Sequence, residues 1–245
     1  MTDITSDISN ALPAVTQAAL VKVNIAKASW LDARNRHEAA VAQGDIIRQR
    51  RRETEATATA QNDEWRRLFR ENGGVMTPEM KKLRAEVALN RESLEEFDAL
   101  LALHAQENEL LPWETSDRAL AYISAHSDLV NLRAMQLWQM FMDAHGQQLI
   151  QTLSLLKITL GRQASAGIGE VHSVNDPDTA LKNFITRNIT DPALVRDALP
   201  EDDVFQHAGA FPARGACDDY RNSPSPAARH KILARREMVQ KEQAQ

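Results

Sequence analysis

Several residue types are scarce in this 245-residue chain, and each scarcity narrows the structures that it can form. A single cysteine, Cys217, excludes an internal disulfide and suits a reducing compartment. Aromatic residues make up only 5% of the chain, whereas apolar residues reach 43%, and much of that share is alanine. Because alanine buries little area, this composition favours close contact between helices over a bulky core.

Two further absences bear on location and partners. No apolar run approaches the ~18 residues of a membrane span, and the polar start MTDITSDISN lacks the features of a signal peptide, so we expect no membrane association. Acidic residues outnumber basic ones, 34 to 29, which gives a net charge of -5. Nucleic-acid binding needs a basic footprint, so we expect no direct nucleic-acid partner. The protein is expected to act, or to be assembled, in the cytosol.

Helix signals dominate the first half of the chain. Pro13 suits the first turn of a helix, and Gly73 and Gly74 can end it. Thr77 can cap a second helix. The apolar positions of this second helix alternate steps of three and four, as in a coiled-coil seam: Met80, Leu83, Val87, Leu94, Phe97 and Leu101. With a short turn between the two, an antiparallel helical hairpin is predicted.

The second half of the chain is less regular. Pro112 should end the second helix, and Thr115–Asp117 should start a third that runs to about Leu160 and ends at Gly161. The remaining elements are expected to be short helices at Thr179–Asn188 and Pro192–Leu199, an irregular extended arm from Pro200, and a basic final helix from about Pro226. No segment alternates with period two long enough to build a sheet. These patterns predict an all-α protein with two regions: a hairpin over residues 1–112 and a C-terminal helical region over residues 113–245.

No motif for catalysis, cofactor binding or metal binding survives inspection. HEAAV has valine where a zinc-protease helix needs its second histidine, and GIG follows a helix instead of a strand. Cys217 lacks a neighbour at metal-ligand spacing. RQRRR, at Arg48–Arg52, is flanked by acidic residues and fits a solvated helix face better than a binding patch. We therefore expect no enzyme, no cofactor and no metal site.

An aromatic face is predicted on the third helix. Trp138, Phe141 and His145 follow one another at steps of three and four, so they share one side. We assign them to packing or to a dimer seam, together with Trp30 and Phe97. A lone histidine on such a face is more often a hydrogen-bonded packing residue than a ligand or catalyst.

Three segments, in order, resemble the satellite-phage polarity-suppression protein family (Psu). KASWLDARN resembles the family's KAAWLQRKN, and FMDAHGQQL resembles its FMQQHGTAL. AGAFPARGACDDYR resembles IGFRPDVASVDDSR without a gap, and the similarity continues into the basic last helix. The chain between Asn35 and Phe141 is much longer than in the family example, which a lengthened hairpin would explain. Pro224 stands where the family example has phenylalanine.

The resemblance implies a non-enzymatic protein with two roles. Members of the family bind the host transcription-termination factor Rho, a hexameric RNA-dependent ATPase and translocase, and suppress Rho-dependent termination. They also decorate the satellite-phage capsid. Their fold is all-helical, and two chains intertwine as a homodimer around long coiled-coil helices. We therefore expect a Rho inhibitor in the host bacterial cytoplasm. The alternative is a capsid decoration protein on the virion surface, without anti-Rho activity.

The candidate partner-binding residues are charged and lie near the last helix. They are Asp218, Asp219, Arg221, Arg235 and Arg236. A charged cluster beside a helix start can bind a partner through charge-assisted hydrogen bonds. The alternative is that these side chains only lock the arm to the rest of the protein.

Overall fold

The computed structural model describes residues 12–166, 176–196 and 201–243, and every element in these ranges is a helix. The helices fall into two compact units that are discontinuous in sequence. Unit 1 comprises residues 1–23 and 124–212, and unit 2 comprises residues 24–123 and 213–245. The two longest helices, α2 (Ala14–Glu71) and α4 (Leu111–Ala166), contribute residues to both units. The all-α class predicted from the sequence is thereby confirmed.

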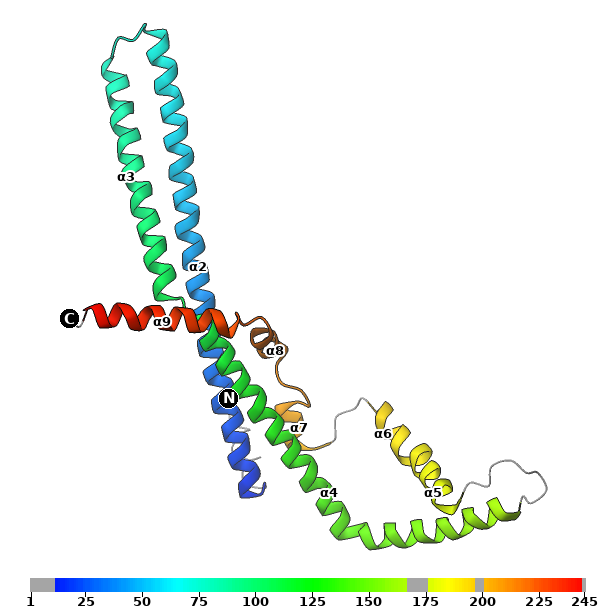
Figure 1. The fold of residues 1–245 in the computed structure, drawn as a ribbon. Coiled ribbons are helices and arrows are strands. Elements are labelled where there is room, and N and C mark those ends of the chain that lie inside the picture. Colours follow the sequence, from blue (N-terminus) through cyan, green and yellow to red (C-terminus); the bar gives the residue numbers. More distant parts are fainter. Residues whose placement is uncertain (1–11, 167–175, 197–200, 244–245) are drawn as a thin grey trace, which may run out of the picture. The chain divides into compact units, whose positions relative to one another are not determined.

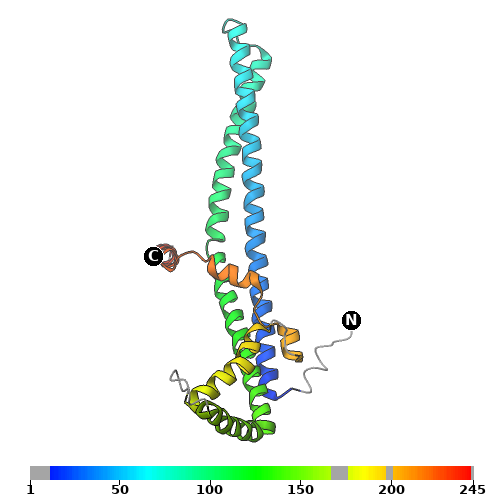
Figure 2. The ribbon, with the colours of Figure 1, turned by 90° about the vertical axis from the view of Figure 1, so that its right-hand side faces the viewer.

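The hairpin of unit 2 is built from α2 and α3 (Pro78–Glu107), which lie side by side in two views (Figures 1 and 2). The turn between them uses the expected signals. Gly73 and Gly74 adopt positive φ angles of 57° and 87°, which glycine reaches without steric cost, and the Gly74 N–H donates to the Phe69 carbonyl. Thr77 caps α3 by accepting from the Met80 N–H at 3.3 Å, and Met80 is fully buried.

Polar side chains also take part in the hairpin seam. Asn90 donates to Gln61 at 2.7 Å, and Gln61 donates to Glu86 at 2.9 Å, so this polar layer is hydrogen-bonded across the two helices. Further along, a His104 ring nitrogen lies 2.8 Å from the Ala40 carbonyl oxygen. Gly44 does not break α2. It is buried, and a Cβ there would approach the His104 ring to 3.3 Å, so the glycine makes room for the histidine.

The start and end of α4 differ from the sequence expectation. Pro112 lies in the first turn of α4, where the missing N–H costs nothing, so the helix begins at Leu111, earlier than Thr115. At the other end, α4 continues through Gly161 to Ala166, because a single glycine weakens a helix without stopping it. Residues 167–175, which follow α4, lie outside the described residues.

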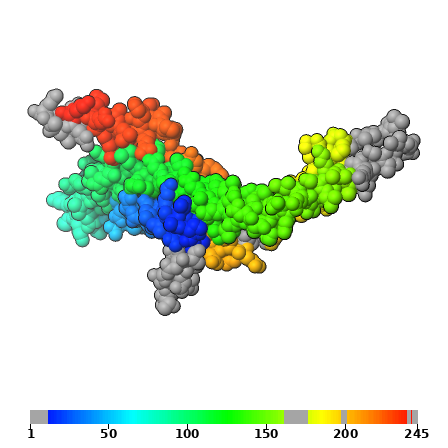
Figure 3. Space-filling model, turned by 90° about the horizontal axis from the view of Figure 1, so that it is seen from below, coloured from blue at the N-terminus to red at the C-terminus, as the bar shows by residue number. Residues whose placement is uncertain are grey.

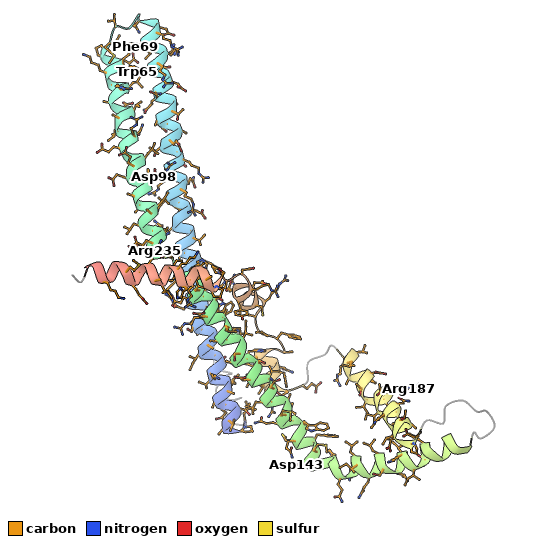
Figure 4. All side chains as sticks on the ribbon, in the orientation of Figure 1. Trp65, Phe69, Asp98, Asp143, Arg187 and Arg235 are labelled. Atoms are coloured by element: carbon orange, nitrogen blue, oxygen red, sulfur yellow. The ribbon has the colours of Figure 1, made fainter. Side chains whose placement is uncertain are left out.

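The C-terminal part of α4, which we call its distal part, bends near Asp143 (Figure 4). Gly146, close to this bend, is buried because the Met142 side chain folds over it. A Cβ at Gly146 would meet the Met142 Cε at 2.9 Å. The glycine of the DAHGQ segment therefore accommodates a neighbour on its own helix.

Two short helices follow in unit 1. Asp176 caps α5 (Pro177–Ile185), which passes through a π-helical turn, η1 (Thr186–Thr190), into α6 (Asp191–Val195). The expected break between the two short helices is thus a change in helical winding. Leu199, the expected end of the second of these two short helices, lies outside the described residues.

The segment expected to be an irregular arm contains two further helices, which corrects that prediction. α7 (Asp203–Ala208) belongs to unit 1, and α8 (Arg214–Arg221) belongs to unit 2. Gly209, with φ of 77°, ends α7. α9 (Pro226–Gln243) is the basic final helix, beginning where the sequence indicated.

Candidate partner-binding surfaces

In unit 2, α8 is held against α2 and α4 by two stacked aromatic side chains, Trp30 and Tyr122, which we call the aromatic clamp. Trp30 is 3% exposed and stacks on Tyr122, with ring centroids 5.5 Å apart and planes 5° from parallel. The Trp30 Nε1–H donates to the Asp219 carboxylate at 2.8 Å, and the Ala213 N–H donates to the Tyr122 hydroxyl at 3.2 Å. Tyr122 therefore binds the backbone at the start of α8, and Trp30 binds a side chain near its end.

Arg34 adds charge to this clamp. Its guanidinium lies 3.4 Å from Asp219, donates to Glu38 at 2.8 Å, and lies over the Trp30 ring at 5.8 Å from the centroid. The hydrogen bond to Glu38, with added attraction from Asp219, raises the pKa of Arg34 and outweighs the opposing effect of burial. Asp219 thus faces a permanently charged partner and an indole donor, and its side chain is only 22% exposed.

The other charged residues of α8 remain open. Asp218 is 46% exposed, and its nearest cations, Arg214 and Arg221, lie 3.9 and 4.0 Å away, at the outer limit of an ion pair. Arg221 is 78% exposed. Of the α8 residues singled out in the sequence, Asp218 and Arg221 therefore face solvent, whereas Asp219 is engaged by unit 2 itself.

The basic side chains of α9 hold it against the junction of α3 and α4. Figure 3 shows the orange-to-red residues of α9 lying against green residues. Arg235 forms a short ion pair with Glu109, and Arg236 donates to the Gln106 carbonyl at 2.6 Å. Arg229 pairs with Asp117 at 2.7 Å. The acidic partners of these arginines could not be predicted from the sequence, because they lie more than 100 positions away from α9.

Arg235 is labelled in Figure 4 at the base of the hairpin. Although paired, its side chain stays 62% exposed, whereas that of Arg236 is 35% exposed. A partner contact by either residue, as by the three α8 residues, stays a prediction.

The three side chains of the aromatic face share one side of α4, and no described part of the same chain covers them. Trp138 and Phe141 have ring centroids 6.0 Å apart, and Phe141 and His145 have centroids 5.6 Å apart. Trp138 is 53% exposed and Phe141 43% exposed. Phe97, in contrast, lies half-buried in the hairpin. The sequence spacing located the α4 face but could not tell whether the same chain covers it.

Unit 1 contains an ion pair that sequence analysis did not identify. Arg133 donates to Asp202 through two nitrogens, at 2.7 and 3.0 Å, with side chains 12% and 8% exposed. Asp202 also caps α7 by accepting from the Val204 and Phe205 N–H groups. Burial opposes ionisation of Asp202, but the hydrogen bond from Arg133 and those from the backbone outweigh it, so the pKa is lowered. This pair anchors α7 to α4.

The described residues contain no group of histidine, cysteine, aspartate or glutamate side chains arranged to hold a metal ion. Within the same ranges, no helix is both long enough and apolar enough to cross a membrane. The features that remain are surfaces: the open charges of α8, the α9 arginines and the aromatic face of α4.

The chain is similar in sequence to one phage protein and in fold to a chain of a solved phage structure. The chain is 32% identical over 128 residues to "Glycoprotein 3" of Enterobacteria phage P4, an alignment that spans half of each protein. Its fold matches a chain of a solved structure described as "Satellite phage P4 procapsid including size determination (Sid) protein", with a TM-score of 0.67 at 21% identity. That match covers 94% of this chain and 98% of the other.

The family comparison also covers most of the chain. Residues 16–241 match the family described as "Phage polarity suppression protein (Psu)". The matched range includes the hairpin, the aromatic face of α4 and the helices α8 and α9. The chain therefore belongs to the phage polarity suppression protein family.

Proposed function

We propose that this protein binds the shell of a phage procapsid and takes part in setting the size of that shell. The observation that carries this proposal is the extent of the structural match. The match to a chain of the P4 procapsid structure covers 94% of this chain and 98% of the other, so it extends over both the hairpin and the C-terminal region. The 32% identity to a phage P4 protein supports the same setting.

The surface of unit 1 supports a role that depends on protein partners. The distal part of α4 exposes large apolar side chains on more than one side, among them Met135 at 65%, Trp138 at 53%, Ile150 at 59% and Leu155 at 62%. Apolar patches of this kind on a folded protein mark interaction surfaces. Binding to a shell or to a second copy removes this surface from water.

A homodimer is part of the proposal. The aromatic face of Trp138, Phe141 and His145 lies on one side of α4, and no described part of its own chain covers it. A second chain that packs there buries the two aromatic rings, and aromatic side chains dominate the energetics of such interfaces. Two linked copies also double the contacts with a symmetric shell, which raises the effective affinity.

Co-expression with a phage P4-type capsid protein tests the proposed function. Electron microscopy of the resulting shells should show a diameter distribution that shifts when the protein is present. Phe141→Ser should reduce this shift by weakening the dimer, whereas Leu194→Ser, which removes a 78% exposed apolar side chain of α6, serves as the matched control. An unchanged distribution in the presence of soluble, helical protein contradicts the proposal.

Inhibition of Rho-dependent termination is the second candidate, and the family description, polarity suppression, favours it. In this case the open charges of α8, Asp218 and Arg221, are the proposed contacts with Rho, together with Arg235 and Arg236 of α9. A reconstituted transcription reaction with Rho should then yield more read-through transcript as the protein is added. Unchanged termination at saturating folded protein rejects this candidate and leaves the procapsid proposal standing.

A further inference from the structure

A second heptad stripe runs along α3, beside the seam that packs against α2. Leu89, Ser93, Glu96, Leu100 and Leu103 follow one another at alternating steps of four and three. This spacing matches one side of a coiled coil. The three leucines are 63%, 46% and 51% exposed, so no part of the described chain covers the stripe.

The stripe borders a groove on the surface of the hairpin. The groove has a volume of about 740 Å³ and is lined by Thr54 of α2 and by Leu89, Glu92, Glu96, Phe97 and Leu100 of α3. We call it the α3 groove. Its lining combines apolar groups with polar ones, including Asn90, Ser93 and the two carboxylates, and such a combination suits an amphipathic helix.

Some carboxylates of the hairpin are paired with a cation, but among the described residues the two in the α3 groove are not. Within the described residues, neither Glu92 nor Glu96 has an ion-pair partner. By comparison, Asp98 is bound by Arg51 at 2.6 Å, and this hydrogen bond lowers the pKa of Asp98. Figure 4 labels Asp98 midway along the hairpin. The groove therefore combines uncovered leucines with unneutralised negative charge.

We infer that the α3 groove binds an amphipathic helix of another protein, with basic residues flanking its apolar seam. Such a helix turns the two-helix hairpin into a three-helix coiled coil, covers Leu89 and Leu100, and pairs with Glu92 and Glu96. The charges argue against two alternatives. The same groove of a second copy would oppose like charges, and the arginines of α9 are already paired with Glu109 and Asp117.

The inference goes beyond the proposed function, since it concerns unit 2 and not the aromatic face of α4. Its test uses the full-length protein and two designed peptides of about three heptads each. Both peptides carry leucine at the seam positions, and they differ only in having arginine or glutamate at the flanking positions. Fluorescence anisotropy should show the basic peptide binding at least about tenfold tighter than the acidic one, with an affinity that falls as salt is added.

Variants separate the groove from the rest of the hairpin. Glu92→Gln together with Glu96→Gln should weaken binding of the basic peptide about fivefold or more. Each exposed ion pair contributes little by itself, so both are removed together. Leu100→Ser should weaken it as well. Glu95→Gln, on an exposed position of α3 outside the groove, should leave it unchanged. Circular dichroism melting of each variant confirms that the hairpin is intact.

Three results would overturn the inference. Equal binding of the two peptides removes the charge argument, and an equal loss in Glu95→Gln removes the location. Self-association of the wild-type protein that Leu100→Ser abolishes, measured by sedimentation velocity, would identify a second copy as the occupant.

Discussion

Replacement of Asp219 by alanine is the perturbation that tests the clamp between α8 and α2. The change removes the acceptor for Trp30 Nε1 while the indole stays buried, and an orphaned buried donor costs about 1–3 kcal/mol. The partly exposed ion pair with Arg34, at 3.4 Å, adds at most about 1 kcal/mol. We therefore expect Asp219→Ala to lower the free energy of unfolding by about 2–3 kcal/mol.

Two further variants separate the loss of the hydrogen-bond acceptor from the loss of charge. Asp219→Asn keeps an oxygen for the indole and loses only the charge, so its cost should be about 1 kcal/mol or less. Asp218→Ala removes two ion pairs near 4 Å from an exposed position and should change stability by less than about 0.5 kcal/mol. Urea unfolding followed by circular dichroism measures all three. A wild-type midpoint for Asp219→Ala would refute the clamp, and equal losses for Asp218→Ala and Asp219→Ala would show that the charge of α8 as a whole matters.

Three other predictions concern the ion pair of unit 1, the polar layer of the hairpin and the aromatic face of α4. Because Arg133 and the backbone lower the pKa of Asp202, its pairing should stabilise unit 1 at neutral pH and be lost as pH falls below about 4, through the folded-state pKa. Arg133→Ala should cost about 3 kcal/mol and flatten that acid dependence in thermal melts, and an unaltered pH profile would contradict it. Asn90→Ala should cost about 1–2 kcal/mol by leaving Gln61 without its donor, and a variant that melts like the wild type would dismiss the polar layer. Phe141→Ser should halve the mass measured by light scattering, and a monomeric wild-type protein would exclude the proposed dimer.

Local signals in the sequence predicted the hairpin and the start of its second helix. Gly73, Gly74 and Thr77 act within a few residues of their own position, so their effect can be read without a structure. Pro112 was misread because proline is compatible both with the end of one helix and with the first turn of the next.

The short helices and their anchors could not be predicted in the same way. α7 has six residues, too few for a periodic pattern, and it is held by Asp202 and by Arg133, a residue 69 positions away. The clamp from Trp30 to Asp219 likewise joins residues 189 positions apart. A sequence motif could mark the charged residues of α8 but could not show which of them would be turned inward.

The proposal that this protein works bound to a phage shell is supported by the fold that it shares with a chain of the P4 procapsid structure and by its exposed apolar surfaces. Co-sedimentation of the purified full-length protein with shells assembled from a P4-type capsid protein alone tests it most directly. The account predicts saturable binding at a fixed ratio of protein to capsid subunit. Folded protein that stays in the supernatant at every concentration would contradict the claim.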